Sequence, residues 1–187
     1  MALELKRRRF TVEEYYWMAR VGILGEDDRV ELIDGEIVEM TPIGHRHAVC
    51  VKNLTRAFYH LFDDVAVISV QDPVHLSDYS EPEPDLALLT PPADSYLSGH
   101  PRPRDILLIV EVAHSSADPD RRIKVPLYAR SGITEIWLVD LEQETVTVYL
   151  DPTSTGYLSA KVVRRGELLA PAAFPDRPLA VADILPV

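Results

Sequence analysis

Two acidic residues stand in or beside apolar segments, where an ionised carboxylate needs a cationic partner. Glu111 interrupts the apolar run 106–113, which reads as a strand buried on both faces, and Asp85 opens the strand-like run 85–89. Together these carboxylates could bind a divalent cation such as Mg²⁺ or Mn²⁺. A cation held there would polarise a phosphoryl oxygen and lower the pKa of a bound water. The pair therefore predicts a metal-dependent phosphodiesterase.

Lys124 is the second candidate partner for Glu111. It lies on a predicted helix that starts at about Ser116 or Asp118, runs to Arg130 and is closed by Gly132. From this helix the amine could orient the attacking water or neutralise the transition state. The residues also leave a second interpretation open, in which Glu111 and Lys124 form a buried structural ion pair without a metal.

Strand alternation predicts where the two carboxylates point. Every second residue of 107–113, including Glu111 and Ala113, shares one face, and Asp85 shares a face with Ala87. If the two strands are neighbours, the carboxylates should lie within about 4 to 6 Å of each other, close enough to share one cation. The small side chains of Ala87 and Ala113 leave space beside them.

The elements that must position these residues follow from periodicity and turn chemistry. They are a helix capped by Thr11 and ending near 21–22, a hairpin of 30–33 and 36–40 around Asp34-Gly35, a helix over about 45–62, strands at 65–70, 85–89, 106–113, 134–139 and 144–150, and the helix of Lys124. This order predicts an α/β protein of the mixed α+β type, with a mixed central sheet flanked by helices, an N-terminal hairpin and a C-terminal β appendage. Pro126 should kink or shorten its helix.

The chain of 187 residues shows no repeat or low-complexity linker, so we expect a single domain over 1–187, with a core at about 11–150 and an extension at 151–187. The apolar runs are too short for a membrane helix, and polar residues follow the basic run 6–9 where a secretory signal would be apolar. A single cysteine, Cys50, excludes an intrachain disulfide and fits a cytoplasmic protein. The net charge of -11 counts against a protein whose main task is to neutralise nucleic-acid phosphates, although basic residues cluster locally.

The order Pro84-Asp85, then Glu111 in an apolar strand, then a lysine resembles the PD-(D/E)XK, or restriction-endonuclease-like, nuclease superfamily. The wider pattern is similar to its bacterial Uma-type endonuclease branch. The matching segments are residues 30–38, 71–74, 81–87, 109–112, 127–129 and 132–140, together with His47 and Lys124, and the resemblance covers about 11–150. It implies a restriction-endonuclease-like core that hydrolyses DNA phosphodiester bonds with Mg²⁺ or Mn²⁺.

The resemblance also implies roles for individual residues. Asp85 and Glu111 would be metal ligands, Lys124 the catalytic lysine and Glu31 an accessory acid beside the metal. His47 is similar to a histidine that this branch often carries on the corresponding helix. By themselves, Glu31 reads as an exposed strand residue and His47 as a core histidine.

This chain departs from the superfamily pattern at one position. The lysine is expected two residues after the acid, where this chain has Ala113. The short side chain of Ala113 leaves room for Lys124 to reach the acid from the next helix.

Substrate and partner predictions rest on the charged and apolar residues outside this cluster. Near Lys124, Arg121 and Arg122 are candidates for binding nucleic acid, although such pairs are also typical of solvated helix faces. The apolar tail either covers the core or forms a homodimer interface; its large residues are Phe174, Leu179, Ile184 and Leu185.

Two further functions remain open beside a DNA endonuclease. The acidic balance and the displaced lysine would suit a non-catalytic protein of the same fold that serves as a binding or scaffold protein. An acidic surface would also tolerate a small phosphoester substrate better than a long polyanion, which favours a metal-dependent hydrolase of small phosphoesters. A continuous positive groove leading to Asp85 and Glu111 would favour the nuclease over the small-substrate hydrolase, and metal occupancy would favour either enzyme over the scaffold.

Overall fold

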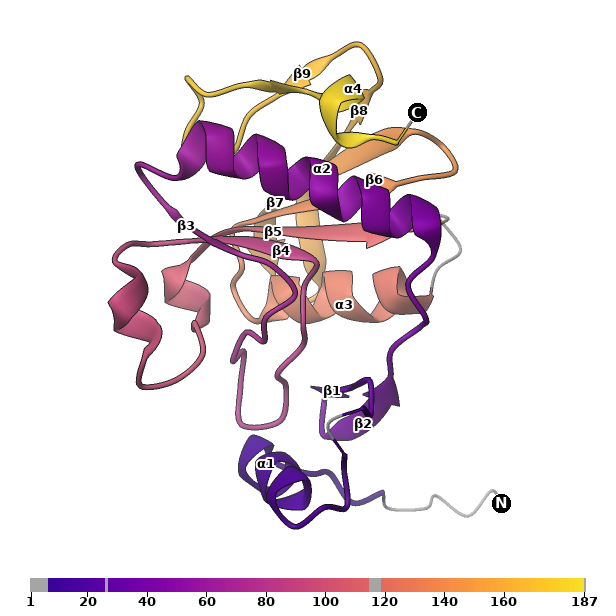
Figure 1. Cartoon of the computed structure of the whole chain (residues 1–187), viewed down its shortest axis with the longest axis vertical. Helices are drawn as coiled ribbons and strands as arrows, with labels where there is room; N and C mark the ends of the chain where they lie inside the picture. Colours follow the sequence, from indigo (N-terminus) through magenta and orange to yellow (C-terminus); the bar gives the residue numbers. More distant parts are fainter. Residues whose placement is uncertain (1–6, 26, 115–118, 187) are drawn as a thin grey trace.

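The computed structural model describes residues 7–25, 27–114 and 119–186, and it places a six-stranded sheet at the centre of the protein (Figure 1). The strand order is β3-β4-β5-β6-β7-β8. β5 and β6 pair in parallel and the other neighbours are antiparallel, so the sheet is mixed. The predicted fold class is confirmed.

The main-sheet strands are β3 (Val67–Ser69), β4 (Leu86–Leu89), β5 (Ile106–Ala113), β6 (Glu135–Asp140), β7 (Thr145–Thr153) and β8 (Gly156–Arg164). The helices are α1 (Val12–Arg20), α2 (His45–Phe62), α3 (Pro119–Arg130) and α4 (Val181–Ile184), with short 3-10 turns η1 (Ala93–Tyr96) and η2 (Pro103–Asp105). Two small hairpins complete the described part, β1 (Val30–Ile33) with β2 (Glu36–Glu39), and β9 (Leu168–Leu169) with β10 (Leu179–Ala180). None of the helices in these described ranges is both long and apolar enough to cross a membrane.

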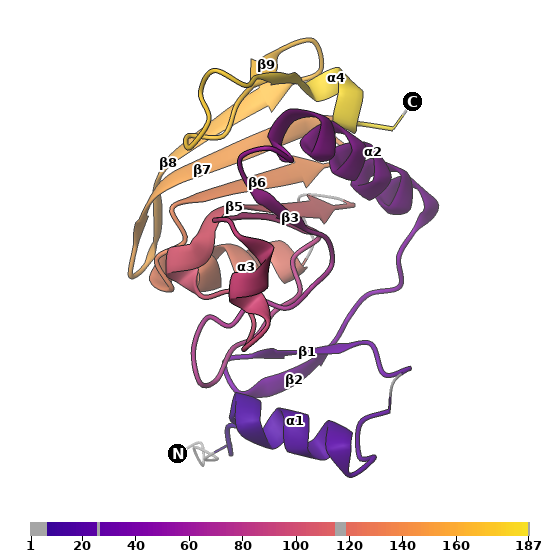
Figure 2. The same cartoon turned by 60° about the vertical axis from the view of Figure 1, so that its left-hand side comes forward.

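Helices cover both faces of the sheet, as Figures 1 and 2 show. On one face α2 and α4 bury Leu54 and Ile184 in the same core cluster as Leu108. On the other face α3 buries Leu127 and Tyr128 against Ile109 and other strand residues. From Leu108 to Val112 the residues of β5 alternate as the sequence predicts, but Leu107 packs against the first cluster instead of sharing a face with Ile109, next to a register shift in the pairing with β4.

The N-terminal residues form a separate layer below the sheet, made of α1 and the β1–β2 hairpin (Figure 2). The predicted capping box is present, because Thr11 Oγ1 accepts from the Glu14 N–H and Glu14 accepts from the Thr11 N–H. The predicted Asp34-Gly35 turn is also present, with φ of 51° and 80°. An ion pair between Asp34 and Arg130 joins the turn to the end of α3.

Pro126 does not end α3, contrary to the expected shortening. The helix continues to Arg130, and Leu127, Tyr128 and Ala129 are all buried. Packing of this last turn against the sheet offsets the backbone hydrogen bond that the proline removes.

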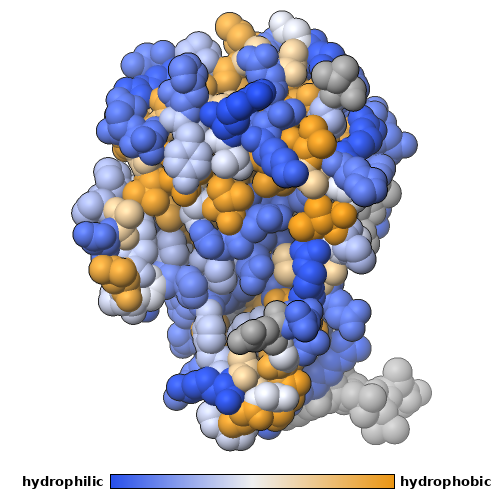
Figure 3. Space-filling view, viewed as in Figure 1, coloured by the Kyte–Doolittle hydropathy of each residue, from blue (hydrophilic) through white to orange (hydrophobic). Residues whose placement is uncertain are grey.

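The C-terminal segment adds β8 to the edge of the main sheet and then folds over the face that carries α2. Three of the large apolar tail residues, Leu179, Ile184 and Leu185, are buried, and Phe174 packs against the same cluster. Of the two roles considered for the tail, the structure therefore shows coverage of the core. On the face in Figure 3, hydrophilic residues predominate and hydrophobic residues occur in small scattered groups.

Candidate active site

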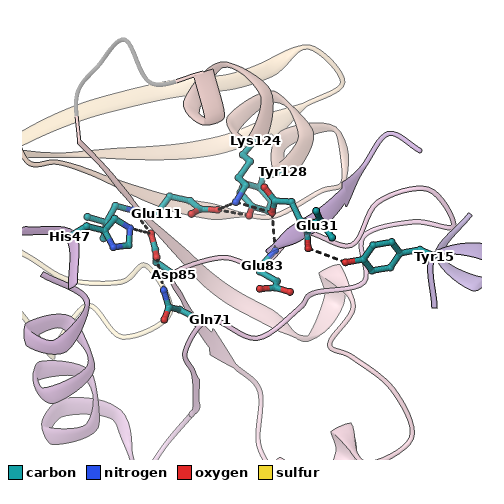
Figure 4. A network of polar contacts seen from close by, with 11 residues as sticks. Tyr15, Glu31, His47, Gln71, Glu83, Asp85, Glu111, Lys124 and Tyr128 are labelled. Carbon is teal, nitrogen blue, oxygen red and sulfur yellow. Dashed lines mark hydrogen bonds and ion pairs between the residues drawn. The ribbon is translucent and has the colours of Figure 1, made fainter. Parts of the chain in front are cut away.

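Five of the residues singled out in the sequence line one cavity of about 430 Å³ between the main sheet and the N-terminal layer. The cavity-lining residues Glu31, His47, Asp85, Glu111 and Lys124 come from β1, α2, the residue before β4, β5 and α3. In Figure 4, His47 and Gln71 contact Asp85, and Lys124 contacts Glu31 and Glu111. Five separate parts of the chain therefore build this site.

Asp85 and Glu111 lie at facing positions on adjacent strands. β4 pairs with β5 so that Leu86 is opposite Val110, and Asp85 precedes the first residue while Glu111 follows the second. The predicted neighbour relationship of the two strands is confirmed. From this position the charge of Asp85 contributes to raising the pKa of Glu111.

Asp85 is held by donors from three directions. Its Oδ2 accepts a hydrogen bond from the backbone N–H of Val112 at 2.8 Å and lies 3.0 Å from Nε2 of His47. The side-chain amide of Gln71 donates to the other oxygen, Oδ1, at a longer distance of 3.4 Å. The carboxylate is 8% exposed, and its more weakly bonded oxygen is Oδ1.

Glu111 is held from the opposite side by α3. The hydroxyl of Tyr128 donates to Oε1 at 2.6 Å, and Nζ of Lys124 lies 3.5 Å from the same oxygen. Burial raises the pKa of Glu111; Lys124 opposes that rise, and the charge of Asp85 adds to it. Oε2 is the oxygen that neither Tyr128 nor Lys124 contacts in these interactions.

Lys124 bridges two carboxylates. Its Nζ lies 3.0 Å from Oε2 of Glu31 as well as near Glu111. Glu31 Oε2 also accepts the backbone N–H of Glu83 at 3.1 Å. Lys124 thus reaches Glu111 from α3, and Ala113, where the superfamily pattern has its lysine, lines the same cavity.

His47 contacts Asp85 from the first turns of α2. Burial lowers the pKa of the imidazole, but the hydrogen bond to Asp85 and the charges of Asp85 and Glu111 outweigh burial, so the pKa is raised. The other ring nitrogen, Nδ1, is buried without a hydrogen-bond partner among the described residues. The imidazole is therefore anchored through Nε2 alone.

The carboxylate pair fits a hard divalent cation. Mg²⁺ binds proteins through oxygen ligands, keeps several waters and commonly takes only one or two carboxylates. Across residues 7–25, 27–114 and 119–186, no group of three or more His, Cys, Asp or Glu side chains is arranged as a ready-made metal centre. Asp85 Oδ1 and Glu111 Oε2 could supply two ligands, with the remaining positions left to water and substrate.

The structure does not bring Arg122, one of the two predicted nucleic-acid contacts, into this cavity. Arg122 is exposed on α3 and is not a cavity-lining residue, and the side chain of Arg121 lies outside the described part of the chain.

The structure adds Tyr128 and Gln71 to the site, for which sequence reasoning proposed no role. Tyr128 follows Lys124 by four residues, so helical spacing alone places both on one face and could have indicated it. Gln71 carries no comparable periodic signal.

Most of the chain, including the residues that line the cavity, matches a known protein family. The family model described as "Putative restriction endonuclease", named Uma2, matches residues 12–182. The chain belongs to the Uma2 family. The match spans the acidic residues of the cavity, Lys124 and nearly all of the C-terminal extension, so the nuclease resemblance read from the sequence is confirmed at the level of the family.

A solved structure with the same fold is a putative nuclease from Anabaena variabilis ATCC 29413. The two chains are 16% identical, with a TM-score of 0.69 over 94% of this chain and 97% of that chain. This likeness shows the fold. The comparison with curated proteins gave no match.

Proposed function

We propose that this Uma2-family protein is a metal-dependent endonuclease that hydrolyses DNA phosphodiester bonds, with Asp85 and Glu111 holding Mg²⁺ or Mn²⁺. One observation carries the proposal. Two carboxylates face each other across the pairing of β4 and β5 and line one cavity, and a buried lysine on the helix that covers this face reaches one of them. A cation bound there would supply Lewis-acid chemistry and a water of lowered pKa.

The protein side chains divide the remaining work. Lys124 neutralises charge that develops on the phosphoryl oxygens as the water oxygen bonds to phosphorus and the bond to the leaving sugar oxygen breaks. Glu31 positions Lys124 through the 3.0 Å ion pair. The 3.0 Å contact with His47 positions Asp85 through Oδ2, so Oδ1 would be the oxygen that could hold the cation.

A few basic residues are proposed to bind the DNA. Arg29 lines the cavity, and Arg121 and Arg122 are proposed to contact phosphates next to the cleaved bond. A net charge of -11 makes broad phosphate neutralisation unfavourable, so binding should depend on these few cations and weaken only modestly with salt.

Cleavage assays on DNA test the proposal. Wild-type protein should cut plasmid and oligonucleotide DNA with Mg²⁺ or Mn²⁺ and should not cut after chelation. Asp85→Asn and Glu111→Gln should reduce the cleavage rate by about a hundredfold or more, since each removes a ligand charge but little volume. The exposed Asp176, changed to Asn, serves as the control and should leave the rate unchanged.

The other two functions predict different results in the same assay. Cleavage of a small phosphodiester without cleavage of any DNA would favour the small-substrate hydrolase. A protein that binds neither Mg²⁺ nor Mn²⁺ and cuts no DNA would fit the non-catalytic binding or scaffold protein, and the nuclease proposal would be abandoned.

A further inference from the structure

The cavity has two chemically different walls. One wall carries the acidic residues Glu31, Asp85 and Glu111 together with Lys124. The other is the segment that connects β2 to α2, which contributes Met40, Pro42 and Ile43. This connection runs along the side of the molecule from the N-terminal layer to the start of α2 (Figure 1). A ligand that fills the cavity must therefore present a charged group at one end and an apolar surface at the other.

The size of the cavity limits what can reach the carboxylates. A volume of about 430 Å³ lies within the range of about 300 to 1,000 Å³ that is typical of sites for one small molecule. The major groove of a DNA duplex is by itself about 12 Å across, so a whole duplex is too wide to fit inside a cavity of this size. Asp85 is only 8% exposed, so a phosphate must enter the cavity to reach it, and an unpaired nucleotide enters at lower cost than one held in a stacked helix.

The charge of the lining favours a short ligand as well. Among the residues that the structure describes, its acidic members are Glu31, Glu83, Asp85 and Glu111, and its Lys and Arg members are Arg29 and Lys124. Four carboxylates against two such cations repel a tract of phosphates but tolerate one phosphodiester, especially beside a bound divalent cation.

A nucleotide has the two-ended chemistry that these walls require. We propose that the site takes DNA at an unpaired nucleotide, either in a single strand or displaced from a duplex. Its phosphodiester lies at Asp85 and Glu111, and its base packs against Met40, Pro42 and Ile43. This inference rests on the proposed function, and it names the form of DNA on which that function acts.

A fully paired duplex must first unstack and unpair a nucleotide to use the cavity, and this lowers its apparent affinity and cleavage rate. The direct test compares a labelled single-stranded oligonucleotide, a duplex with one bulged nucleotide, and a fully paired duplex of the same sequence. Binding is followed by fluorescence anisotropy with Ca²⁺, and cleavage with Mn²⁺. The first two DNAs should bind and be cut at least about tenfold better than the paired duplex.

Equal binding and cleavage of all three DNAs would overturn the inference, and so would failure to bind any of them. The proposed function is judged separately, by Mn²⁺ binding and by cleavage of any DNA. A protein that binds Mn²⁺ and cuts paired duplex as fast as single strands would retain the proposed function and lose only this inference.

Ile43 provides a residue-level test of the apolar wall. Ile43 is 41% exposed and Ile23, outside the cavity, is 61% exposed, so serine at either position should leave the fold intact. Ile43→Ser should raise KM for the single-stranded oligonucleotide by about three- to tenfold with unchanged Mn²⁺ affinity, since it removes apolar contact with the base. Ile23→Ser should change neither. An unchanged KM in Ile43→Ser, or a matching loss of Mn²⁺ affinity, would overturn the placement of the base.

Discussion

Nζ of Lys124, on α3, lies 3.0 Å from Oε2 of Glu31, on β1, and the two side chains are 6% and 2% exposed. The same amine lies 3.5 Å from Glu111 on β5. One buried cation therefore joins the N-terminal hairpin, the central sheet and the helix below it. Removing it would leave two buried carboxylates without their shared partner.

Lys124→Met should destabilise the protein by about 3 to 5 kcal/mol, because truncation of one partner of a buried ion pair leaves uncompensated charge. Urea unfolding measures this free energy. The control is Arg122→Met, on the same helix but exposed, which should change stability by no more than about 0.5 kcal/mol. Adding Glu111→Gln to Lys124→Met should restore part of the loss. Equal free energies of unfolding for Lys124→Met and Arg122→Met would contradict the buried ion pairing of Lys124.

The raised pKa of Glu111 predicts how stability depends on pH without metal. In the folded protein this carboxyl binds its proton more tightly than in the unfolded chain, so the folded state holds more protons between the two pKa values. The free energy of unfolding should therefore fall as pH rises from the ordinary glutamate range, about 4.3, through the raised pKa. Urea midpoints across this window should show the decline in the wild type and a weaker one in Glu111→Gln. A steeper decline in the variant would show that the pKa of Glu111 is lowered instead.

Tyr128 should matter for metal binding through Glu111. Tyr128→Phe removes the hydroxyl that donates to Oε1 and should weaken Mn²⁺ affinity by about tenfold, since partners of a metal ligand fix its orientation. Tyr157→Phe is a matched control, because its hydroxyl donates to the backbone oxygen of Ile133, away from the cavity. Calorimetric titration of both variants checks this. Equal losses of affinity would assign Tyr128 a general structural role only.

Substitution of Gly35 tests how tightly the turn of the β1–β2 hairpin, which carries Glu31, packs against Arg9. Its φ is +80°, and a Cβ there would lie 2.6 Å from Cβ of Arg9, so Gly35→Ala combines backbone strain with a steric clash. Gly22 has a φ of +77° and open space around it, so Gly22→Ala carries the strain alone, about 1 kcal/mol. Thermal or urea unfolding should show a larger loss for Gly35→Ala. Equal losses would mean that Arg9 moves aside freely.

Local parts of this structure could be predicted because their causes lie within a few residues. The capping box needs only Thr11 and Glu14, and the tight turn needs only Asp34 and Gly35. The facing positions of Asp85 and Glu111 follow from strand alternation once their strands are known to be neighbours.

Long-range contacts were harder to predict, because they depend on how distant elements pack. Nothing near Glu31 in the chain indicates that its partner is Lys124, and its own residue pattern suggested an exposed position. Helical spacing places Tyr128 on the same face of α3 as Lys124, but its contact with Glu111 depends on how α3 packs against β5. Pro126 is a local helix-breaking signal, but α3 continues past it because the last turn packs against the sheet. Distant packing therefore also overrides a local sequence signal.

The central claim is that Asp85 and Glu111 form a divalent cation site, and calorimetric titration of wild-type protein and Asp85→Asn with Mn²⁺ tests it most directly. The account predicts saturable binding of one ion per chain to the wild type. It predicts a loss of affinity of at least about tenfold in Asp85→Asn, while the unfolding transition of the variant stays cooperative. Equal Mn²⁺ affinity in the two proteins, or no binding to the wild type, would contradict it.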